Sequence, residues 1–260
     1  EQMKPFIVDT VELMHKELEK GSRIMIEGAN AAMLDIDYGT YPYVTSSNCT
    51  VGGCLTGLGI PHTALGEVVG VVKAYTTRVG GGPFLTECLN VKGSEYYDPS
   101  KEGEDAHDTI GQHLETVGHE IGTSTGRTRR CGWLDLVVVK YTNRLNGYTC
   151  VNLTKLDVLT NLPGGKIKLG VAYKLDGKEI HSFPGSLKDM GRCEVVYETM
   201  PAWTEDITGV KTYEELPQKA KDYIERIEEV TGCHCKYIGV GPDREATITK
   251  EAPTRKRKAA

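Results

Sequence analysis

The sequence predicts an α/β fold with a mixed, largely parallel central sheet flanked by helices. Apolar stretches of strand length alternate with helical stretches, and several of these apolar stretches are continuous rather than alternating in polarity. Continuous apolar strands are typical of sheets that are covered on both faces. Glycine is also abundant, at 30 of 260 residues, which indicates tight turns and close backbone approaches rather than a helical bundle.

The expected elements follow these stretches in chain order. Strands are expected at 23–27, 67–72, 134–139, 150–153, 167–175 and 236–240. Helices are expected at 6–20, 104–117 and 213–230. The last helix is the clearest, because Pro217 stands near its start and Gly232 marks its end.

Composition argues against several classes of protein. Hydrophobic residues make up 39% and charged residues 26%, which is ordinary for a globular protein with a real core. The net charge of −5 gives no sign of a nucleic-acid-binding protein, and the longest apolar runs are too short to cross a bilayer. The chain opens without a secretory signal, and its eight cysteines lack paired spacing apart from Cys233-His234-Cys235. We therefore expect reduced thiols in a cytoplasmic protein rather than structural zinc.

The end of the chain differs from the rest. Residues 1–249 are expected to belong to one large domain, and residues 250–260 to form a basic tail without apolar periodicity. Such a composition predicts disorder. A solvated terminus is the favoured interpretation, with a nuclear-import or nucleic-acid-binding role as the alternative.

The densest group of hydrogen-bond donors is the segment 123–130, Thr-Ser-Thr-Gly-Arg-Thr-Arg-Arg. The arginine fork suits a carboxylate or a phosphate, and nearby hydroxyl and backbone N–H groups can complete the shell of an anion. A solvated basic turn explains this string equally well in isolation. The segment leads directly into the apolar stretch 134–139, however, so we expect the arginines on a loop at the entry of a strand.

A second segment, Thr154-Lys155-Leu156-Asp157, follows the predicted strand 150–153. It therefore lies at the carboxyl end of that strand, where open α/β sheets bind ligands. Its form is that of the guanine-reading motif [NT]-K-x-D. A carboxylate at Asp157 can accept from both N1–H and the exocyclic amino group of guanine, a pair of donors that adenine cannot supply. A four-residue match is weak alone, and its place after a buried strand strengthens it.

Two further segments are candidates for ligand contact. Gly239-Val240-Gly241 follows the last predicted strand and lets a ligand ring lie against the backbone, although a plain turn is favoured in isolation. The loop 35–48 is long, polar and rich in aromatic residues, which is typical of functional loops. Asp35 and Asp37 within it are expected to serve turns and caps rather than a metal ion. The sequence contains no G-x-x-x-x-G-K-[ST] phosphate loop, and its seven histidines belong to no recognisable catalytic motif.

Taken together, these segments resemble the adenylosuccinate synthetases. The resemblance extends over about residues 5–249, with the strings in that family's order, and Asn30 and Cys49 are similar to its eukaryotic branch. Six strings carry it: EGANAAMLDIDYGTYPYVTSSNCTVGG (27–53), VVKAYTTRVGGGPFLTE (71–87), GTSTGRTRRCGWLDLVVVKY (122–141), LTKLDVL (153–159), YETMPAW (197–203) and YIGVGPDR (237–244).

The resemblance implies a P-loop NTPase-like synthetase fold and a GTP-dependent ligase of purine biosynthesis. That enzyme phosphorylates the 6-oxygen of IMP, and the amine of L-aspartate then displaces phosphate, giving adenylosuccinate and GDP with Mg²⁺ assisting. The resemblance also implies a homodimer without a nucleic-acid or membrane partner.

The resemblance also implies site residues. The IMP site would hold Asn30, Thr45, Val79 and Arg127. The aspartate site would hold Thr123, Ser124, Thr125, Gly126, Arg127, Thr128 and Arg129, as a loop that closes over aspartate. The GTP site would hold Arg129, Lys155, Leu156, Asp157, Gly239, Val240 and Gly241. Thr128 and Leu85 depart from the family pattern, but Arg127 and Arg129 remain.

The resemblance further implies that residues 1–249 are the C-terminal portion of the family's single large domain, with the N-terminal part missing. Family members open with a GDEGKGK phosphate loop bearing the catalytic Asp, followed by a His general acid and an Arg offered to the dimer partner. We therefore expect no catalytic residue and no metal site in this chain, no turnover from it alone, and an exposed strand edge with apolar surface. Two alternatives stay open: a catalytically silent guanine-nucleotide- or IMP-binding module, and a structural α/β domain with a basic tail.

Overall fold

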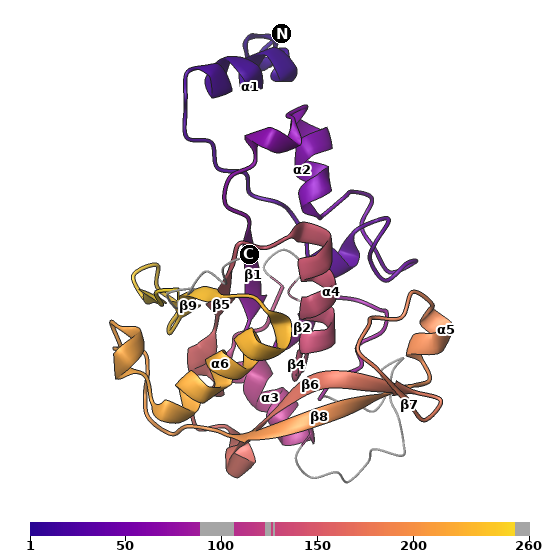
Figure 1. Ribbon diagram of the computed structural model, residues 1–260, viewed down its shortest axis with the longest axis vertical. Helices are drawn as coiled ribbons and strands as arrows, with labels where there is room; N and C mark the ends of the chain where they lie inside the picture. Colours follow the sequence, from indigo (N-terminus) through magenta and orange to yellow (C-terminus); the bar gives the residue numbers. More distant parts are fainter. Residues whose placement is uncertain (89–106, 123–125, 127, 253–260) are drawn as a thin grey trace, which may run out of the picture. The chain divides into compact units, whose positions relative to one another are not determined.

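The computed structural model describes residues 1–88, 107–122, 126 and 128–252, and the chain divides into two compact units (Figure 1). The first unit comprises Glu1–Val68 with Arg144–Gly147, and the second comprises Val69–Asn143 with Tyr148–Ala260. No helix among the described residues is both long and apolar enough to cross a membrane.

The first unit consists of short helices joined by long loops. Helix α1 (Thr10–Glu19), predicted within 6–20, is capped by Asp9, whose side chain accepts the N–H of Glu12 at 3.1 Å. Helix α2 (Val51–Leu58) was not predicted, and it ends at Gly59 in the left-handed region, with φ of 64°. The ring of His15 on α1 lies 3.3 Å from the carbonyl oxygen of Gly59, which joins the two helices.

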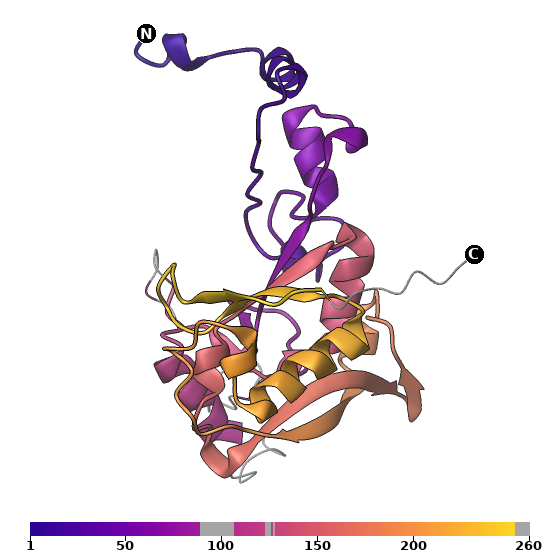
Figure 2. The ribbon, with the colours of Figure 1, turned by 60° about the vertical axis from the view of Figure 1, so that its left-hand side comes forward.

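The described residues of the second unit form three sheets (Figures 1 and 2). In the first, β1 (Val69–Lys73), β5 (Cys150–Thr154) and β9 (Cys235–Gly239) are parallel, and β10 (Thr247–Thr249) is antiparallel to β9. In the second, β4 (Leu134–Asp135) is parallel to β6 (Lys166–Leu175), and β7 (Lys178–Ile180) and β8 (Cys193–Pro201) are antiparallel to β6. Strands β2 (Thr76–Arg78) and β3 (Arg130–Gly132) form an antiparallel pair. The predicted mixed α/β class is confirmed, with β1, β5, β6 and β9 close to their expected ranges.

Helices α3 (His107–Val117), α5 (Leu187–Met190) and α6 (Gln218–Thr231) belong to the second unit. Both views show α6 between the first sheet and the long ribbon of β6 and β8 (Figures 1 and 2). Its buried stripe includes Tyr223, whose hydroxyl donates to the carbonyl oxygen of Ala74 at 2.7 Å. The helix begins at Gln218 rather than at residue 213, because Pro217 is its N-cap residue, and it ends at Gly232 as predicted, with φ of 71°.

Two predicted strands are wrong. Residues 23–27 have no regular secondary structure, and Met25 is 88% exposed, because an apolar stretch becomes a strand only where another strand pairs with it. The stretch 134–139 divides between β4 and α4 (Leu136–Asn146). The carboxylate of Asp135 accepts the N–H groups of Val137 at 3.0 Å and Val138 at 3.2 Å. This cap starts a helix and overrides the strand preference of the valines.

Strand β1 lies at one edge of the first sheet. Among the described strands it pairs with β5 alone, and Val69 and Val71 are 40% and 72% exposed. The expectation of an exposed strand edge bearing apolar side chains therefore agrees with β1.

The structure also bears on the predicted basic tail and on the cysteines. Lys250, the first residue of the predicted tail, is held to the fold by an ion pair of 2.5 Å with Glu228. Residues 253–260 of that tail lie outside the described residues. All eight cysteines carry free thiols.

Buried Asp135 should make stability depend on pH. Its carboxylate also accepts the hydroxyl of Tyr173 at 2.5 Å, and burial raises the pKa of Asp135 from 3.8 to about 6. Between these values the folded state holds a proton that the unfolded state releases. The free energy of unfolding should therefore fall as pH rises from about 4 to about 6, by up to about 3 kcal/mol.

The variant Asp135→Asn keeps an oxygen acceptor for the helix but has no titrating group. Its free energy of unfolding should therefore lack that fall when both proteins are unfolded in urea at pH 4, 5, 6 and 7. Parallel pH profiles of the wild type and the variant would contradict the prediction.

Candidate functional site

The turn that follows β5 presents a buried acceptor. Lys155 has φ of 60°, in the left-handed region, and is followed by a 3-10 helix at Leu156–Leu159. The oxygen Oδ1 of Asp157 is buried and has no hydrogen-bond partner among the described residues. Burial raises the pKa of the Asp157 carboxyl, and the nearby Asp206 carboxylate adds to that effect. A buried acceptor without a donor costs about 1–3 kcal/mol, so this oxygen fits a ligand that brings N–H donors.

The glycine-rich turn at residues 239–241 lies directly beside the turn that holds Asp157. Strands β5 and β9 are parallel neighbours, with Leu153 opposite Ile238, so both chains leave the sheet at the same edge. A Cβ atom on Gly239 would lie 3.3 Å from the Cα atom of Thr154. The structure therefore brings six of the predicted GTP-binding residues to one edge of the sheet: Lys155, Leu156, Asp157, Gly239, Val240 and Gly241.

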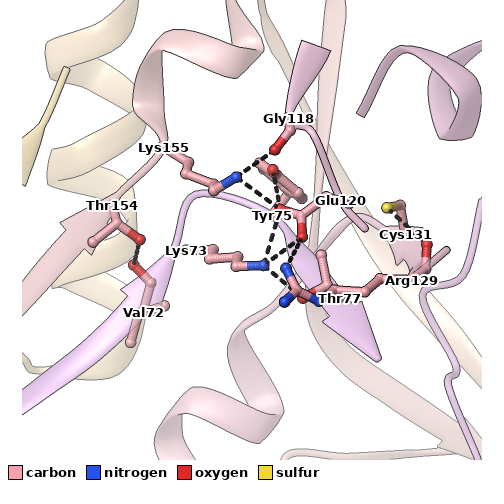
Figure 3. Close-up of polar contacts among 10 residues, drawn as sticks. All are labelled: Val72, Lys73, Tyr75, Thr77, Gly118, Glu120, Arg129, Cys131, Thr154 and Lys155. Atoms are coloured by element: carbon pink, nitrogen blue, oxygen red, sulfur yellow. Dashed lines mark hydrogen bonds and ion pairs between the residues drawn. The ribbon is translucent and has the colours of Figure 1, made fainter. Parts of the chain in front are cut away.

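Next to this turn, the fully buried carboxylate of Glu120 meets four donors from three segments of the chain (Figure 3). Lys73 Nζ lies 2.8 and 2.9 Å from its two oxygens, and the hydroxyl of Tyr75 lies 2.5 Å away. Arg129 Nη1 and Lys155 Nζ lie at 2.8 and 3.1 Å. Burial alone would raise the pKa of Glu120, but the hydrogen bonds from Lys73, Tyr75 and Arg129 outweigh it and lower the pKa to about 2. We call these five residues the Glu120 cluster.

Local backbone geometry places Glu120. The end of α3 turns at Gly118, whose N–H donates to the carbonyl oxygen of Leu114 at 3.1 Å. A Cβ atom on Gly118 would lie 2.3 Å from that oxygen and from the hydroxyl of Tyr75, so only glycine fits. The ammonium of Lys155 donates to the Gly118 carbonyl oxygen, which ties this turn to the one after β5.

Part of the arginine-rich segment is described. Ile121 and Thr128 form an isolated antiparallel bridge, and the N–H of Arg129 donates to the carbonyl oxygen of Glu120 at 2.8 Å. Gly126 has φ of 64°. Thr123, Ser124, Thr125 and Arg127 lie outside the described residues. Among the predicted aspartate-binding residues that are described, Arg129 is the one that joins the Glu120 cluster.

Arg130, the third arginine of the segment 123–130, makes contacts outside the Glu120 cluster. Arg130 is the first residue of β3, a strand that was not predicted, rather than part of a loop before a strand at 134–139. It pairs twice with the Glu87 carboxylate at 2.7 Å. Its Nη1 atom donates to the carbonyl oxygens of Gly80 and Gly82 at 3.2 and 2.9 Å. Arg130 therefore holds the loop that carries Val79, a predicted IMP contact that is 54% exposed.

Two predicted IMP contacts lie in the first unit. Asn30 is exposed with φ of 64°, and the N–H of Thr45 donates to the carbonyl oxygen of Leu34 at 2.8 Å. The loop between them is organised by Asp35, which is fully buried and accepts four backbone N–H groups. The expectation that Asp35 serves turns is confirmed. The described residues hold no group of three His, Cys, Asp or Glu side chains that could bind a metal ion.

Sequence reasoning missed three residues of the Glu120 cluster. Lys73 and Tyr75 stand in one of the six strings, but nothing in that string shows which way they face. Glu120 stands three residues before Thr123 with no pattern that marks it as a shared acceptor.

Comparison with known proteins fits this geometry. A family model described as adenylosuccinate synthetase matches residues 1–248. The chain belongs to the adenylosuccinate synthetase family. It is 51% identical over 251 residues to the adenylosuccinate synthetase of Lodderomyces elongisporus, and 52% identical over 250 residues to that of Coprinopsis cinerea. Each alignment covers 96% of this chain and 54% of the relative, so the chain spans about half the length of the curated relatives it matches.

Solved structures agree with the family assignment. The chain is similar to a fully ligated adenylosuccinate synthetase from Plasmodium falciparum, with a TM-score of 0.85 and 45% identity over 96% of this chain and 55% of that one. A succinoaminodeoxyadenylate synthetase of cyanophage S-2L, bound to dGMP and dATP, has a TM-score of 0.53 and 19% identity over 94% of this chain and 50% of its own. This second likeness concerns the fold alone.

Proposed function

We propose that this chain supplies the guanine-reading surface and part of the aspartate and IMP surfaces of an adenylosuccinate synthetase. That enzyme ligates L-aspartate to IMP at the expense of GTP, giving adenylosuccinate, GDP and phosphate. The observation that carries the proposal is the buried Oδ1 atom of Asp157, which has no hydrogen-bond partner in the described part of the chain. This atom lies in the turn that contains Lys155, beside Gly239.

Guanine supplies the donors that this turn lacks. Its N1–H and exocyclic amino groups point the same way, and one carboxylate accepts both. Adenine presents an acceptor at N1 and only a C–H at C2, so an adenine nucleotide would leave Asp157 buried and unpaired. The glycines at 239 and 241 let the purine ring lie close to the backbone.

The Glu120 cluster suits anionic groups nearby. Three cations, Lys73, Arg129 and Lys155, surround one carboxylate, which gives a local charge of +3 − 1 = +2. Such a surplus attracts phosphate and carboxylate groups. In this proposal Arg129 reaches the GTP phosphates, Arg127 bridges aspartate and the IMP ribose, and Thr123, Ser124, Thr125, Gly126 and Thr128 complete the aspartate site.

The remaining roles follow the family. Asn30 and Thr45 would hold the IMP phosphate, and Val79 would line the IMP pocket. The 6-oxygen of IMP would accept the phosphoryl group of GTP before the aspartate amine displaces it. Mg²⁺, a homodimer and a cytoplasmic location belong to this proposal as properties of the family.

A second candidate is a guanine-nucleotide- or IMP-binding module without catalysis. It is favoured by a guanine-reading turn whose predicted residues lie together at one edge of the sheet, in a chain that spans about half the length of its relatives. In both cases we propose that the 28.5 kDa chain binds guanine nucleotides and makes no adenylosuccinate alone.

The test is calorimetric titration of the chain with GTP and with ATP, together with an assay for adenylosuccinate from IMP, GTP and aspartate. We expect GTP to bind at least about tenfold more tightly than ATP, because ATP leaves the Asp157 acceptor unpaired. Equal affinities would overturn the guanine-reading role. Adenylosuccinate formation by a protein whose intact mass is 28.5 kDa would overturn the proposal of an inactive chain.

A further inference from the structure

The Glu120 carboxylate joins parts of the chain that the proposed function uses separately. Arg129 belongs to the arginine-rich segment, Lys155 belongs to the guanine-reading turn, and Lys73 ends β1. All three cations converge on one fully buried acceptor (Figure 3). A single side chain thus sets the positions of two predicted ligand-binding segments relative to each other.

The contact matters most for Lys155. A non-glycine residue in the left-handed region is destabilised by about 1–2 kcal/mol relative to an ordinary backbone, so something must hold it there. The ammonium of Lys155 is held by the Glu120 carboxylate at 3.1 Å and by the carbonyl oxygen of Gly118. Both contacts come from the turn after α3, and they secure the backbone turn that presents Asp157.

The contact also leaves Arg129 available to a ligand. The Nη1 atom of Arg129 donates to Glu120, and the guanidinium makes no other hydrogen bond or ion pair with the described residues. The side chain is 27% exposed. Arg129 is therefore anchored at one nitrogen while the rest of the fork can meet an anion.

We propose that Glu120 is a positioning residue for the guanine-reading turn, acting through Lys155, and that it holds this turn and Arg129 as one unit. The inference rests on the proposed function, since it explains how the turn that reads guanine keeps its shape. In this proposal the fully buried Glu120 acts through the cations that it holds and not by contact with the nucleotide. Its lowered pKa is consistent with this role, because an ionised carboxylate is needed to hold three cations.

The main test compares the ratio of GTP affinity to ATP affinity in the wild-type chain and in Glu120→Gln. A glutamine has about the same shape, but it carries no charge and turns an amide N–H₂ toward donors. We expect the ratio to fall about tenfold, because loss of a charge-assisted contact frees Lys155 and its turn. A merely structural glutamate would change the melting temperature and leave the ratio as it is.

Glu228→Gln is the matched control. Glu228 also gathers several donors, the His234 ring at 2.9 Å, the Cys235 N–H at 2.8 Å and the Lys250 ammonium at 2.5 Å. These contacts lie at the start of β9, whereas Gly239 is at its end. We expect this variant to lose stability and to keep the wild-type ratio.

A double-mutant cycle with Lys155→Met tests whether Glu120 acts through Lys155. If Glu120 acts through Lys155, Glu120→Gln should change the ratio little further in a chain that already carries Lys155→Met. Full additivity would overturn the proposal. Should Glu120→Gln fail to fold, Lys155→Met removes the same contact from its partly exposed side, and a wild-type ratio in that variant would overturn the inference as well.

The outcomes separate this inference from the function on which it rests. A wild-type chain with equal affinities for GTP and ATP overturns both. A wild-type preference for GTP that survives in Glu120→Gln overturns the positioning role alone.

Discussion

Replacing Asp157 with asparagine is expected to lower the affinity for GTP by about a hundredfold and to create affinity for xanthosine triphosphate. The carboxylate accepts two donors from guanine, whereas asparagine keeps one acceptor and turns its N–H₂ toward the second donor. The loss of one hydrogen bond to a charged group costs about 1.5–3 kcal/mol, and the two opposed donors bring the total to about 3 kcal/mol. Xanthine carries a carbonyl oxygen where guanine has its amino group, and an asparagine N–H₂ donates to it. Calorimetric titration of the variant with GTP, XTP and ATP measures the loss of affinity for GTP and the gain of affinity for XTP.

The gain of XTP binding is what separates base reading from damage. A variant that merely loosens the turn would lose GTP and gain nothing. Asp206→Asn is the control, because Asp206 lies close enough to influence the pKa of Asp157, while its own carboxylate accepts the N–H of Thr208 at 2.9 Å. That variant should bind GTP with nearly wild-type affinity. An Asp157→Asn chain that binds GTP as tightly as the wild type would remove the basis of the proposed function.

The guanine-reading turn could be predicted because its signal is local. Four consecutive residues carry the chemistry, and the apolar strand 150–153 before them fixes where they lie in an α/β sheet. Gly239 to Gly241 follow the neighbouring parallel strand, so the same rule brings them to the same edge. Periodicity was enough to find these strands and therefore enough to place both turns.

The Glu120 cluster could not be predicted in this way. Its members come from the segment that ends β1 and leads into β2, from the turn after α3, from the residue before β3 and from the turn after β5, and no spacing in the sequence relates these four segments. Their meeting depends on tertiary packing, including the close approach of Gly118 to Tyr75. The sequence alone does not show that Glu120 is buried, because its burial depends on donors that only the folded chain brings to it.

Helix α4 was missed although its signals were in the sequence. The apolar run 134–139 matches a buried strand by composition, and short apolar runs do not distinguish strand from helix. Asp135 as a cap and Gly147, which has φ of 60°, bracket a helix of eleven residues. Weighing these caps against the valines would have given the observed answer.

Replacing Asp35 with alanine is expected to destabilise the first unit by about 3–4 kcal/mol, because four backbone N–H groups lose a charged acceptor and regain water only in part. Oδ1 of Asp35 accepts from Asp37 and Tyr38 at 2.9 and 3.0 Å, and Oδ2 accepts from Cys49 and Thr50 at 2.7 and 3.2 Å. The side chain thus joins both ends of the loop that carries the proposed phosphate contact Thr45. Hydrogen exchange at these four amides measures the loss.

Charge, and not only shape, should decide the result at Asp35. Burial would raise the pKa of Asp35, yet the four backbone hydrogen bonds together lower it below its ordinary 3.8. A group with a lowered folded-state pKa stabilises fully above its unfolded pKa, so protection of these amides should persist above about pH 4 and decline as pH falls below it. Asp35→Asn should be nearly as damaging as Asp35→Ala, because an amide N–H₂ would face donors. Asp37→Asn is the matched control. Among the described residues the Asp37 side chain accepts only Asn48 Nδ2, at 2.7 Å, so this substitution should change the hydrogen-exchange rates of the four amides little. Protection as strong in Asp35→Asn as in the wild type would show that packing, rather than the carboxylate, holds the loop.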